Sequence, residues 1–598
     1  MSRLARPAAQ AKPTYDVVVV GSGYGGGVAA SRLARIGLSV AVLERGREYL
    51  PGEFAETLLA ASSSMQINGN GRRFGAPDAL FDLRTGKDVS ALVGCGLGGT
   101  SLINASVCLT PDTMVLEDEA WPEEMRVDHR LNVGFHRARQ MLAPAPLPLS
   151  VEPMKLASLE RAGAALGHHV ERVPLHVAFE TRANAAGVIQ PACTLCGDCM
   201  AGCNTGSKTT VHATYLTDAV NHGAELFTGA NVRLVERAGS DLWRVVFRKH
   251  GNDTGHVPVG AVTAAMVVLA AGTFGTAEIM MRSREQGLRV SDRLGWRFST
   301  NADVMSFGYN YDKPVNSVGI GHSGRAKVPP PGPAVVGLID LRRRRDPLDR
   351  LALVEATVPS VMAGLLPMLL ATGAKLDADG KISGVAGLIA DVQRNVESFV
   401  AGAYKGPIHH SHAFLAVGHD GAVGRLVFED DTAAVHWPNA GDEPVFTHIS
   451  AALRTGVAAN NGTYVPNPVS SDLLGGGVMT VHPLGGCSMG RDRTTGVVDH
   501  KCRVFDGDPS RRADAVHDGL YICDGSVMPR PLGVHPLFTI TAVAERAMML
   551  FAREHGLALD VSPRPDAPRR EFRAEASAKA GNALAARFGR LFERGAKA

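Results

Sequence analysis

The chain of 598 residues has few cysteines and almost no net charge. Nine cysteines are too few for a disulfide framework at this length, and four of them lie together between Cys193 and Cys203, which suggests a reducing compartment. The formal net charge is +3, from 62 basic and 59 acidic side chains, so no global field favours nucleic acid or an anionic membrane as the main partner. A small, mostly uncharged substrate fits this balance better.

Export signals and long apolar runs are also missing. The first 13 residues carry Arg3, Arg6 and Lys12 but lack the apolar stretch of a signal peptide. The longest apolar stretches, such as Val361–Leu370, fall short of the roughly 20 residues that cross a bilayer. We therefore expect a cytoplasmic protein without a transmembrane helix.

The N-terminal segment has the pattern of a β-α-β unit. Tyr15–Val20 predicts a buried parallel strand, Val28–Gly37 a helix and Leu38–Glu44 a second strand. Between the first strand and the helix, Gly21, Gly23 and Gly26 match G-x-G-x-x-G, and Glu44 ends the second strand, where an acid can bind a ribose hydroxyl. The order of these features predicts a dinucleotide site for FAD or NAD, rather than a chance glycine-rich turn.

The rest of the chain divides by its patterns. A second glycine-rich stretch runs from Gly94 to Asn104, and Ala264–Ala271 predicts another buried strand before a helix at Ala277–Ser283. From residue 301 the pattern changes to alternating strands and turns, which predicts an inserted substrate domain. We expect a cofactor domain at 14–300 and 471–560, the insertion at 301–470, and a tail at 561–598.

Two histidines stand in glycine- and proline-rich surroundings near the C-terminus. His482 opens His-Pro-Leu-Gly-Gly-Cys, and His535 lies in Gly-Val-His-Pro-Leu. Imidazole is well suited to accept a hydroxyl proton near neutral pH, so the two could meet at one carbon centre. A lone histidine is more often structural, and only the surrounding pattern favours these two.

These motifs together resemble the glucose-methanol-choline (GMC) oxidoreductases, and among them the sterol oxidases with non-covalently bound FAD, over nearly the whole chain. The resemblance rests on residues 21–26, 98–104, 482–487 and 524–546. It implies an α/β fold, with a Rossmann-like FAD-binding domain and an inserted α+β domain on an antiparallel sheet. It also implies oxidation of a 3-hydroxysterol or another bulky hydrophobic alcohol by hydride transfer to flavin N5, with O2 or a protein or quinone as the electron acceptor.

By the same resemblance, His482, assisted by His535, would accept the hydroxyl proton. Asn104 would lie near the flavin ring and Val232 near the adenine. The full set of expected cofactor-binding residues is Gly21, Ser22, Gly23, Tyr24, Gly25, Gly26, Glu44, Gly98, Gly99, Ser101, Asn104, Val232, Asp524, Gly525, Phe538 and Thr539.

Glu355 matches the stretch in which sterol oxidases carry the carboxylate that shifts a double bond after oxidation. A desolvated glutamate would have the raised pKa that a proton shuttle needs, whereas the alternative is a strand-edge carboxylate in solvent. His535 stands where sterol oxidases usually carry asparagine, although other branches of the family use histidine there. This departure weakens the sterol assignment more than the family assignment.

Cys193, Cys196, Cys199 and Cys203, within the segment 190–206, have the spacing by which bacterial ferredoxins hold iron-sulfur clusters, although Asn204 replaces the usual proline. A structural zinc or free thiols are the alternatives. A cluster would suit a dehydrogenase that feeds electrons to a quinone or cytochrome, or an electron-carrier flavoprotein without its own alcohol. The Ala- and Arg-rich C-terminal segment could lie on a membrane surface or form a solvated or frayed tail.

Overall fold

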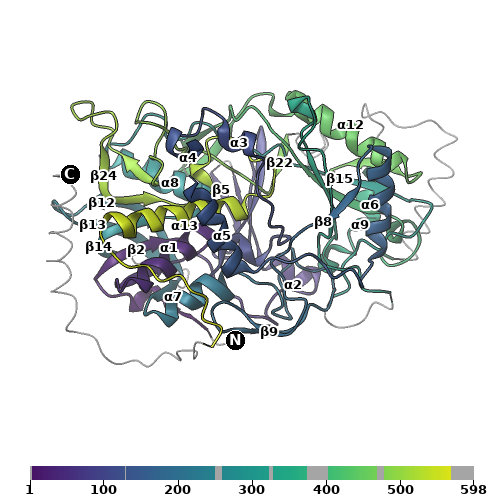
Figure 1. The fold of residues 1–598 in the computed structure, drawn as a ribbon, viewed down its shortest axis with the longest axis horizontal. Coiled ribbons are helices and arrows are strands. Elements are labelled where there is room, and N and C mark those ends of the chain that lie inside the picture. The colour runs from purple at the N-terminus through teal and green to yellow at the C-terminus, as the bar shows by residue number, and fades with distance from the viewer. Residues whose placement is uncertain are drawn as a thin grey trace.

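The computed structural model describes residues 3–69, 71–127, 129–249, 259–321, 328–373, 402–467 and 477–566. Figure 1 shows a large sheet with α1 (Tyr24–Arg35) and α13 (Leu537–Glu554) at one end of the molecule, and a second sheet with α6 (Met154–Ala165), α9 (Leu366–Gly373) and α12 (Pro444–Ala458) at the other. The predicted mixed α/β architecture is confirmed. Most of the predicted tail at 561–598 lies outside the described residues.

The large sheet has nine strands within the described residues. Val17–Val20 are all buried, as expected for a central strand covered on both faces. The parallel strands are joined in the order β1, β11, β3, β2, β14 and β24, while β12, β13 and β23 pair antiparallel. Their bounds are β1 (Ala5–Pro7), β2 (Thr14–Val20), β3 (Val40–Leu43), β11 (Glu225–Thr228), β12 (Ala230–Arg237), β13 (Trp243–Lys249), β14 (Val259–Leu269), β23 (Arg503–Phe505) and β24 (Val516–Ile522).

Helix α1 (Tyr24–Arg35) begins four residues before the predicted start at Val28. The helix therefore includes Gly25 and Gly26, which sequence alone assigns to the loop. A Cβ at Gly25 would lie 1.4 Å from the carbonyl oxygen of Cys523, so only glycine lets the first turn pack against the end of β24. The loop before the helix is correspondingly short.

The second sheet is antiparallel and has six strands within the described residues. Its order is β21 (Thr463–Pro466), β15 (Val304–Tyr309), β18 (His412–Val417), β17 (Ala352–Ala356), β16 (Gly337–Asp340) and β8 (Val170–Arg172). Helices α6 (Met154–Ala165) and α12 (Pro444–Ala458) cover one face. Because α6 and β8 precede residue 301, the sheet extends beyond the range predicted for the insertion.

The two faces of this second sheet belong to different cores. Leu353, Phe414 and Ala416 pack with α6 and α12, whereas Val354 and Leu415 belong to the same core as the large sheet. Side chains alternate along a strand, so residue 355 points to the helix-covered face with Leu353. The other face, toward the large sheet, is apolar.

Elements of the remaining chain cover these two sheets. A five-stranded sheet is formed by β22 (Val478–Thr480), β7 (Val89–Gly94), β6 (Phe81–Arg84), β4 (Met65–Gly69) and β5 (Arg72–Gly75). Two hairpins are formed by β9 (Arg182–Ala183) with β10 (Ile189–Gln190), and by β19 (Arg425–Glu429) with β20 (Thr432–His436). Further helices are α2 (Leu58–Ser62), α3 (Thr113–Glu117), α4 (Glu123–Val127), α5 (Arg130–Leu142), α7 (Thr217–Asn221), α8 (Gly272–Glu285), α9 (Leu366–Gly373), α11 (Gly406–His409) and α13 (Leu537–Glu554).

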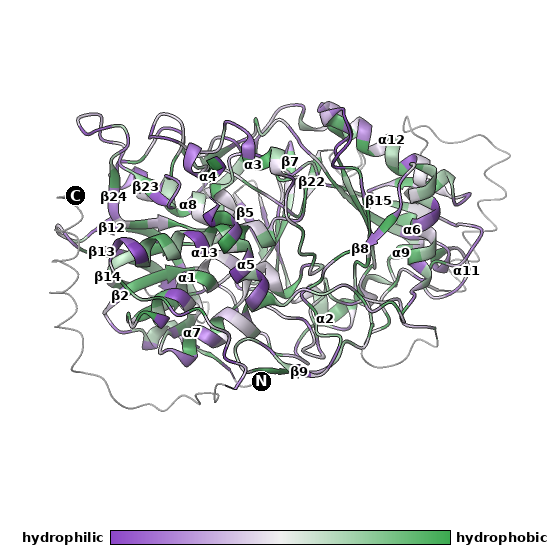
Figure 2. Cartoon of the chain, viewed as in Figure 1, coloured by the Kyte–Doolittle hydropathy of each residue, from purple (hydrophilic) through white to green (hydrophobic). Residues whose placement is uncertain are grey.

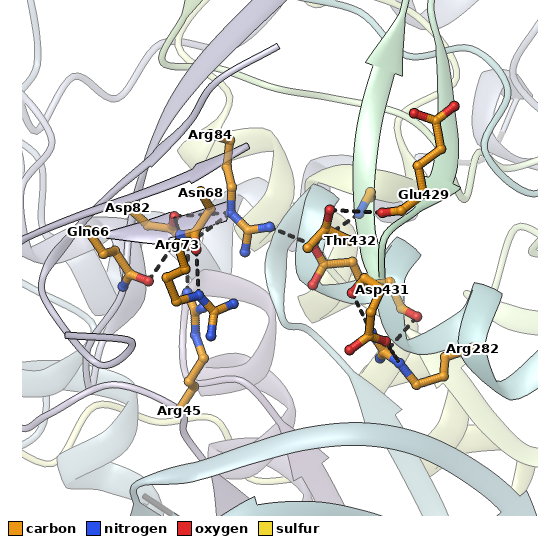
Figure 3. Close-up of polar contacts among 12 residues, drawn as sticks. Arg45, Gln66, Asn68, Arg73, Asp82, Arg84, Arg282, Glu429, Asp431 and Thr432 are labelled. Atoms are coloured by element: carbon orange, nitrogen blue, oxygen red, sulfur yellow. Dashed lines mark hydrogen bonds and ion pairs between the residues drawn. The ribbon is translucent and has the colours of Figure 1, made fainter. Parts of the chain in front are cut away.

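A buried polar network joins the five-stranded sheet to α8 and the β19–β20 hairpin (Figure 3). The Asp82 carboxylate pairs with Arg45 at 2.7 Å and with Arg84 at 3.0 Å, and Arg84 also reaches Glu278 at 2.5 Å. These arginines hold the pKa of Asp82 at about 2, against the opposing effect of burial. Since Arg45 directly follows Glu44, the network fixes the chain just past β3.

Figure 2 shows hydrophobic residues along the strands of the large sheet and hydrophilic ones toward the outer helices and loops. In the part of the chain that the structure describes, no helix is long and apolar enough to cross a membrane.

Candidate active site

The two glycine-rich loops, far apart in sequence, meet at the end of β2. Gly21 has φ +89°, a left-handed conformation that favours glycine. A Cβ there would also lie 2.3 Å from the oxygen of Ala270, so the close packing by itself excludes other residues. Gly99 has φ +57°, and its Cβ would lie 2.8 Å from the Cα of Gly23. A Cβ on Gly23, in contrast, would meet only the Cα of Gly99 at 4.0 Å. Its bare backbone is therefore open to a ligand at the start of α1.

Ser22 and Glu44 tie these loops to the end of β3. The Ser22 hydroxyl donates to Glu44 Oε2 at 2.6 Å and accepts the Gly98 amide at 3.0 Å. Glu44 also accepts the amides of Ser22 and Gly46, at 3.1 and 2.8 Å. Burial raises the pKa of Glu44, and these donors oppose the rise. The structure thus brings the predicted acid to the predicted loop.

Other expected cofactor residues support the same region. Ser101 donates to the Gly98 oxygen at 2.6 Å, which braces the second glycine loop. Val232 lies on β12 two residues after Ala230, whose amide donates to the Glu44 oxygen at 2.9 Å. Val232 therefore lies on the strand that adjoins the end of β3.

Asp524 follows β24 and is buried. Its Oδ2 accepts the Gly272 amide at 2.9 Å and the Thr276 hydroxyl at 2.5 Å, and its Oδ1 accepts the Ser526 amide at 2.9 Å. These bonds join the start of α8 to the turn that contains Gly525. Asp524 therefore holds the carboxyl ends of β14 and β24 together, the edge where ligands bind in open α/β sheets.

Asn104 ends a chain of buried hydrogen bonds that starts at a histidine. Thr209 O accepts from His176 Nδ1 at 3.0 Å, so His176 Nε2 is free to accept the Tyr24 hydroxyl proton at 3.2 Å. Asn104 Nδ2 then donates to the Tyr24 oxygen at 2.6 Å. Burial lowers the pKa of His176 to about 3 and keeps the ring neutral. The chain fixes the orientation of the Asn104 amide.

His482 and His535 are adjacent, as the sequence predicts. Their ring centroids lie 5.1 Å apart with the planes at 80°. His535 is buried, and neither of its ring nitrogens has a hydrogen-bond partner among the described residues. Burial, with a contribution from His482, lowers the pKa of His535 well below its ordinary value and keeps it neutral. Buried ring nitrogens that lack a hydrogen-bond partner indicate a site in which a bound ligand provides that partner.

The helix that follows His535 carries the last two expected cofactor residues. Phe538 lies in the first turn of α13, and its ring centroid is 5.4 Å from that of Phe135. The hydroxyl oxygen of Thr539 is buried and has no partner among the described residues. It is a further buried polar atom without a partner among the described residues, four positions after His535 in the sequence.

Asp303 contacts His482 and was missed by the sequence interpretation. Its Oδ1 lies 2.7 Å from His482 Nδ1, and its side chain is 0% exposed. No local motif marks Asp303, which directly precedes β15 and lies 179 positions before His482 in the sequence. Only the tertiary fold brings the two together.

Glu355 lies in a different environment from the two histidines. It is buried on the helix-covered face of β17, so the alternative of a strand-edge carboxylate in solvent is wrong. Its oxygens accept the amides of Val336 and Gly337 at 2.7 and 2.9 Å, and Lys155 Nζ of α6 lies 3.4 Å away. Burial raises its pKa, against the opposing effect of Lys155.

The four clustered cysteines, all among the described residues, are not paired in disulfides. Cys193 accepts the Leu195 amide and Cys199 the Ala334 amide, both at 3.4 Å, and Cys203 lies 3.2 Å from the Thr205 hydroxyl. Among the described residues, no group of three or more His, Cys, Asp or Glu side chains is arranged to hold a metal ion. The cysteines as placed do not fit a metal site.

The two glycine loops at the end of β2 and the adjacent pair of histidines are features expected of a dinucleotide-dependent oxidoreductase. Two family models, both of GMC oxidoreductase, match residues 15–295 and 457–544. The chain belongs to the GMC oxidoreductase family, which confirms the resemblance seen in the sequence. Family membership implies FAD as the cofactor and an alcohol as the electron donor.

Similar proteins agree with this assignment. A cholesterol oxidase of Acinetobacter baumannii is 25% identical over 91% of this chain and 95% of its own length. A cholesterol oxidase of Mycobacterium tuberculosis (strain ATCC 25618 / H37Rv) is 27% identical over 90% and 91%, and a long-chain-alcohol oxidase of Arabidopsis thaliana is 26% identical over 88% and 66%. Among solved structures, pyridoxine 4-oxidase from Mesorbium loti has a TM-score of 0.56 at 16% identity, covering 90% of this chain and 99% of its own. That likeness shows the fold alone.

Proposed function

We propose that this chain oxidises a bulky hydrophobic alcohol, such as a 3-hydroxysterol, to the ketone or aldehyde with FAD. The observation that carries the proposal is the pair His482 and His535, with the ring nitrogens of His535 buried and unpaired. A substrate hydroxyl placed between the rings would supply the missing partner. The cholesterol oxidases and the long-chain-alcohol oxidase among its relatives support this class of substrate.

The residues present fit FAD. The open backbone at Gly23 and the start of α1 would hold the pyrophosphate, Glu44 the ribose, and Val232 the adenine. The flavin end would lie by Asn104, the Asp524–Gly525 turn, Phe538 and Thr539, where the Thr539 hydroxyl lacks a partner. When bound, FAD supplies the two-electron oxidising chemistry.

The two histidines divide the acid-base work. His482 accepts the hydroxyl proton of the alcohol, because Asp303 leaves it with one free ring nitrogen. His535 stays neutral and holds the substrate oxygen by a hydrogen bond. Burial of His535 would keep water from the substrate oxygen on that side, whereas His482 is partly exposed.

The sheet face toward the large sheet suits an apolar substrate. Val354 and Leu415 belong to the core of that face, and Met305 packs against it. With a sterol as substrate, Glu355 would then shift the double bond after oxidation. This shift requires the carboxylate to leave the amides of Val336 and Gly337 and to act across β17.

A second candidate is a dehydrogenase that passes electrons through a cluster on the four cysteines. One contact favours it: Lys208 Nζ donates to the Cys199 oxygen at 3.1 Å and to the Asn104 oxygen at 2.5 Å, so the cysteine segment adjoins the expected flavin neighbour. Since the thiols as placed do not fit a metal, we derive no step through a cluster.

Anaerobic mixing of the purified holoenzyme with alcohols tests the proposal. A 3β-hydroxysterol in detergent and a long-chain primary alcohol are expected to bleach the flavin, and added O2 to restore the colour with peroxide formed. If every alcohol leaves the flavin yellow, the chain is an electron carrier and the proposal is wrong. Reoxidation by a quinone but not by O2, with iron-sulfur absorbance in the visible spectrum, would support the second candidate.

Replacing Glu44 with glutamine is expected to weaken FAD binding by about 10- to 100-fold. The glutamine amide would place a donor against the amide of Ser22 or of Gly46, which leaves one of them unpaired. Titration of the apoprotein with FAD measures the change. Glu48→Gln is a matched control, because Glu48 is also buried and accepts backbone amides, but those of Leu4 and Ala5. Equal affinity of Glu44→Gln and wild type would contradict the assigned role.

A further inference from the structure

We propose that Asp303 is a positioning residue for His482. It keeps the proton of the imidazole on Nδ1, so that Nε2 is the nitrogen that accepts the substrate proton. The inference rests on the proposed function of His482, and it adds the residue that prepares the imidazole before the alcohol binds.

The contacts of Asp303 leave one carboxylate oxygen for the imidazole. Its Oδ2 accepts three donors from the strand and turn before the ring, namely the Thr480 hydroxyl at 2.7 Å and the amides of Val481 and His482 at 2.8 and 3.0 Å. Its Oδ1 meets His482 Nδ1 at 2.7 Å. The three bonds to Oδ2 fix the direction in which Oδ1 points.

The geometry determines which tautomer is stable. An ionised carboxylate accepts hydrogen bonds and cannot donate, so Nδ1 must carry a hydrogen at this distance. The neutral ring then has a lone pair only on Nε2. When Nε2 takes up the substrate proton, the nearby carboxylate stabilises the positive imidazolium inside a buried site. Asp303 thus orients the His482 ring before the reaction. After the proton transfer, its negative charge stabilises the imidazolium.

The segment that carries Asp303 also holds the second histidine. We call residues 299–303 the catalytic turn. Within it, Asn301 accepts the amides of Leu532 and Gly533 at 2.8 and 3.1 Å and donates to the Val534 oxygen at 3.0 Å, just before His535. Asn301 has φ +58°, a left-handed conformation that asparagine tolerates. One short turn therefore positions the His482 ring through Asp303 and the backbone before His535 through Asn301.

Asp420 provides a matched comparison for Asp303. It is also buried, and it accepts the Thr300 amide at 2.8 Å, the Ala302 amide at 3.2 Å and the Ser299 hydroxyl at 2.8 Å. It braces the same turn, but none of its hydrogen bonds goes to an imidazole. Asp420→Asn therefore separates loosening of the catalytic turn from loss of the contact to the ring.

The test is the ring-nitrogen spectrum of the holoenzyme labelled with nitrogen-15 histidine, with the His482 signals assigned by their loss in His482→Gln. Wild type and Asp420→Asn are expected to show a protonated Nδ1 and an unprotonated Nε2. Asp303→Asn is expected to show a mixture, because the asparagine amide can donate to the ring as well as accept from it. A wild-type His482 protonated on Nε2 would overturn the inference, even if Asp303→Asn fails to fold.

Activity gives the second readout. Asp303→Asn is expected to lower the rate of anaerobic flavin reduction by alcohol about 10- to 100-fold at saturating substrate, with FAD affinity unchanged. Loss of the tautomer in Asp420→Asn to the same degree as in Asp303→Asn would assign the effect to the turn and overturn the role of Asp303. If no alcohol reduces the wild-type flavin, the proposed function fails, while the tautomer measurement still decides the state of His482.

Discussion

Replacing His482 with alanine is expected to leave FAD bound and to lower the rate of flavin reduction by alcohol by about 10²- to 10⁴-fold. The variant loses the nitrogen that accepts the hydroxyl proton. FAD should stay bound because Ser22, Glu44 and Asn104, which would hold it, make hydrogen bonds that do not involve the His482 side chain. Stopped-flow anaerobic reduction measures the rate, and the flavin absorbance of the purified variant measures FAD content.

Two comparisons make the result specific. His412 is buried and hydrogen-bonds the Ser158 hydroxyl through Nδ1, but it lies on β18 beneath α6, so His412→Gln controls for the loss of an imidazole elsewhere in the fold. His482→Ala should also reduce faster at high pH than at neutral pH, since solvent must then remove the hydroxyl proton. A variant that reduces its flavin at the wild-type rate would rule out His482 as the base.

The dinucleotide site was predictable because each of its parts is encoded locally. A buried strand, a glycine turn, a helix and a terminal acid follow one another within about 30 residues, so neighbouring residues specify the geometry. The structure places Ser22 and Glu44 in contact, which agrees with that pattern, whereas the contact of Ser22 with Gly98 joins a loop 76 positions away. The start of α1 was predicted too late because the reason for Gly25 is the distant oxygen of Cys523, which no local pattern reveals.

The residues that orient His482 and Asn104 were not predictable in the same way. Asp303 and His176 act through partners 179 and 152 positions away, and the sequence around each has no motif. The same limit applies to β8, a short strand that joins the second sheet only through pairing with β16. Glu355 shows a further limit. The sequence offers burial of Glu355 as one of two alternatives. The face of β17 to which the side chain points depends on which helix covers the sheet, and the sequence does not reveal this.

The catalytic turn explains why these long-range contacts matter for chemistry. Residues 299–303 connect the cofactor-binding half to β15 of the second sheet, and their side chains reach the segments of both histidines. A substrate bound against the second sheet therefore meets imidazoles whose positions are set at the junction itself. Rigidity of this junction would then hold the proposed base in place relative to the substrate.

The buried pair Arg32–Glu545 joins α1 to α13. Arg32 Nη2 lies 2.5 Å from Glu545 Oε1, both side chains are at most 1% exposed, and the Tyr215 hydroxyl donates to the same carboxylate at 2.8 Å. Arg32→Met would leave that carboxylate buried without its charge partner. We expect the free energy of unfolding to fall by about 3–5 kcal/mol.

Loss of this ion pair should also disturb the glycine loop and the His535 segment, because α1 starts at the glycine loop and α13 starts two residues after His535. Urea unfolding of the holoenzyme measures the stability, and FAD release measures the effect on the site. The double variant Arg32→Met, Glu545→Leu should recover part of the stability, since it leaves no unpaired charge. Arg512→Met, which breaks the exposed pair with Asp514, should leave the free energy of unfolding nearly unchanged. Equal losses for Arg32→Met and Arg512→Met would show that burial of the first pair has no energetic consequence, and that α1 and α13 are held together by apolar packing.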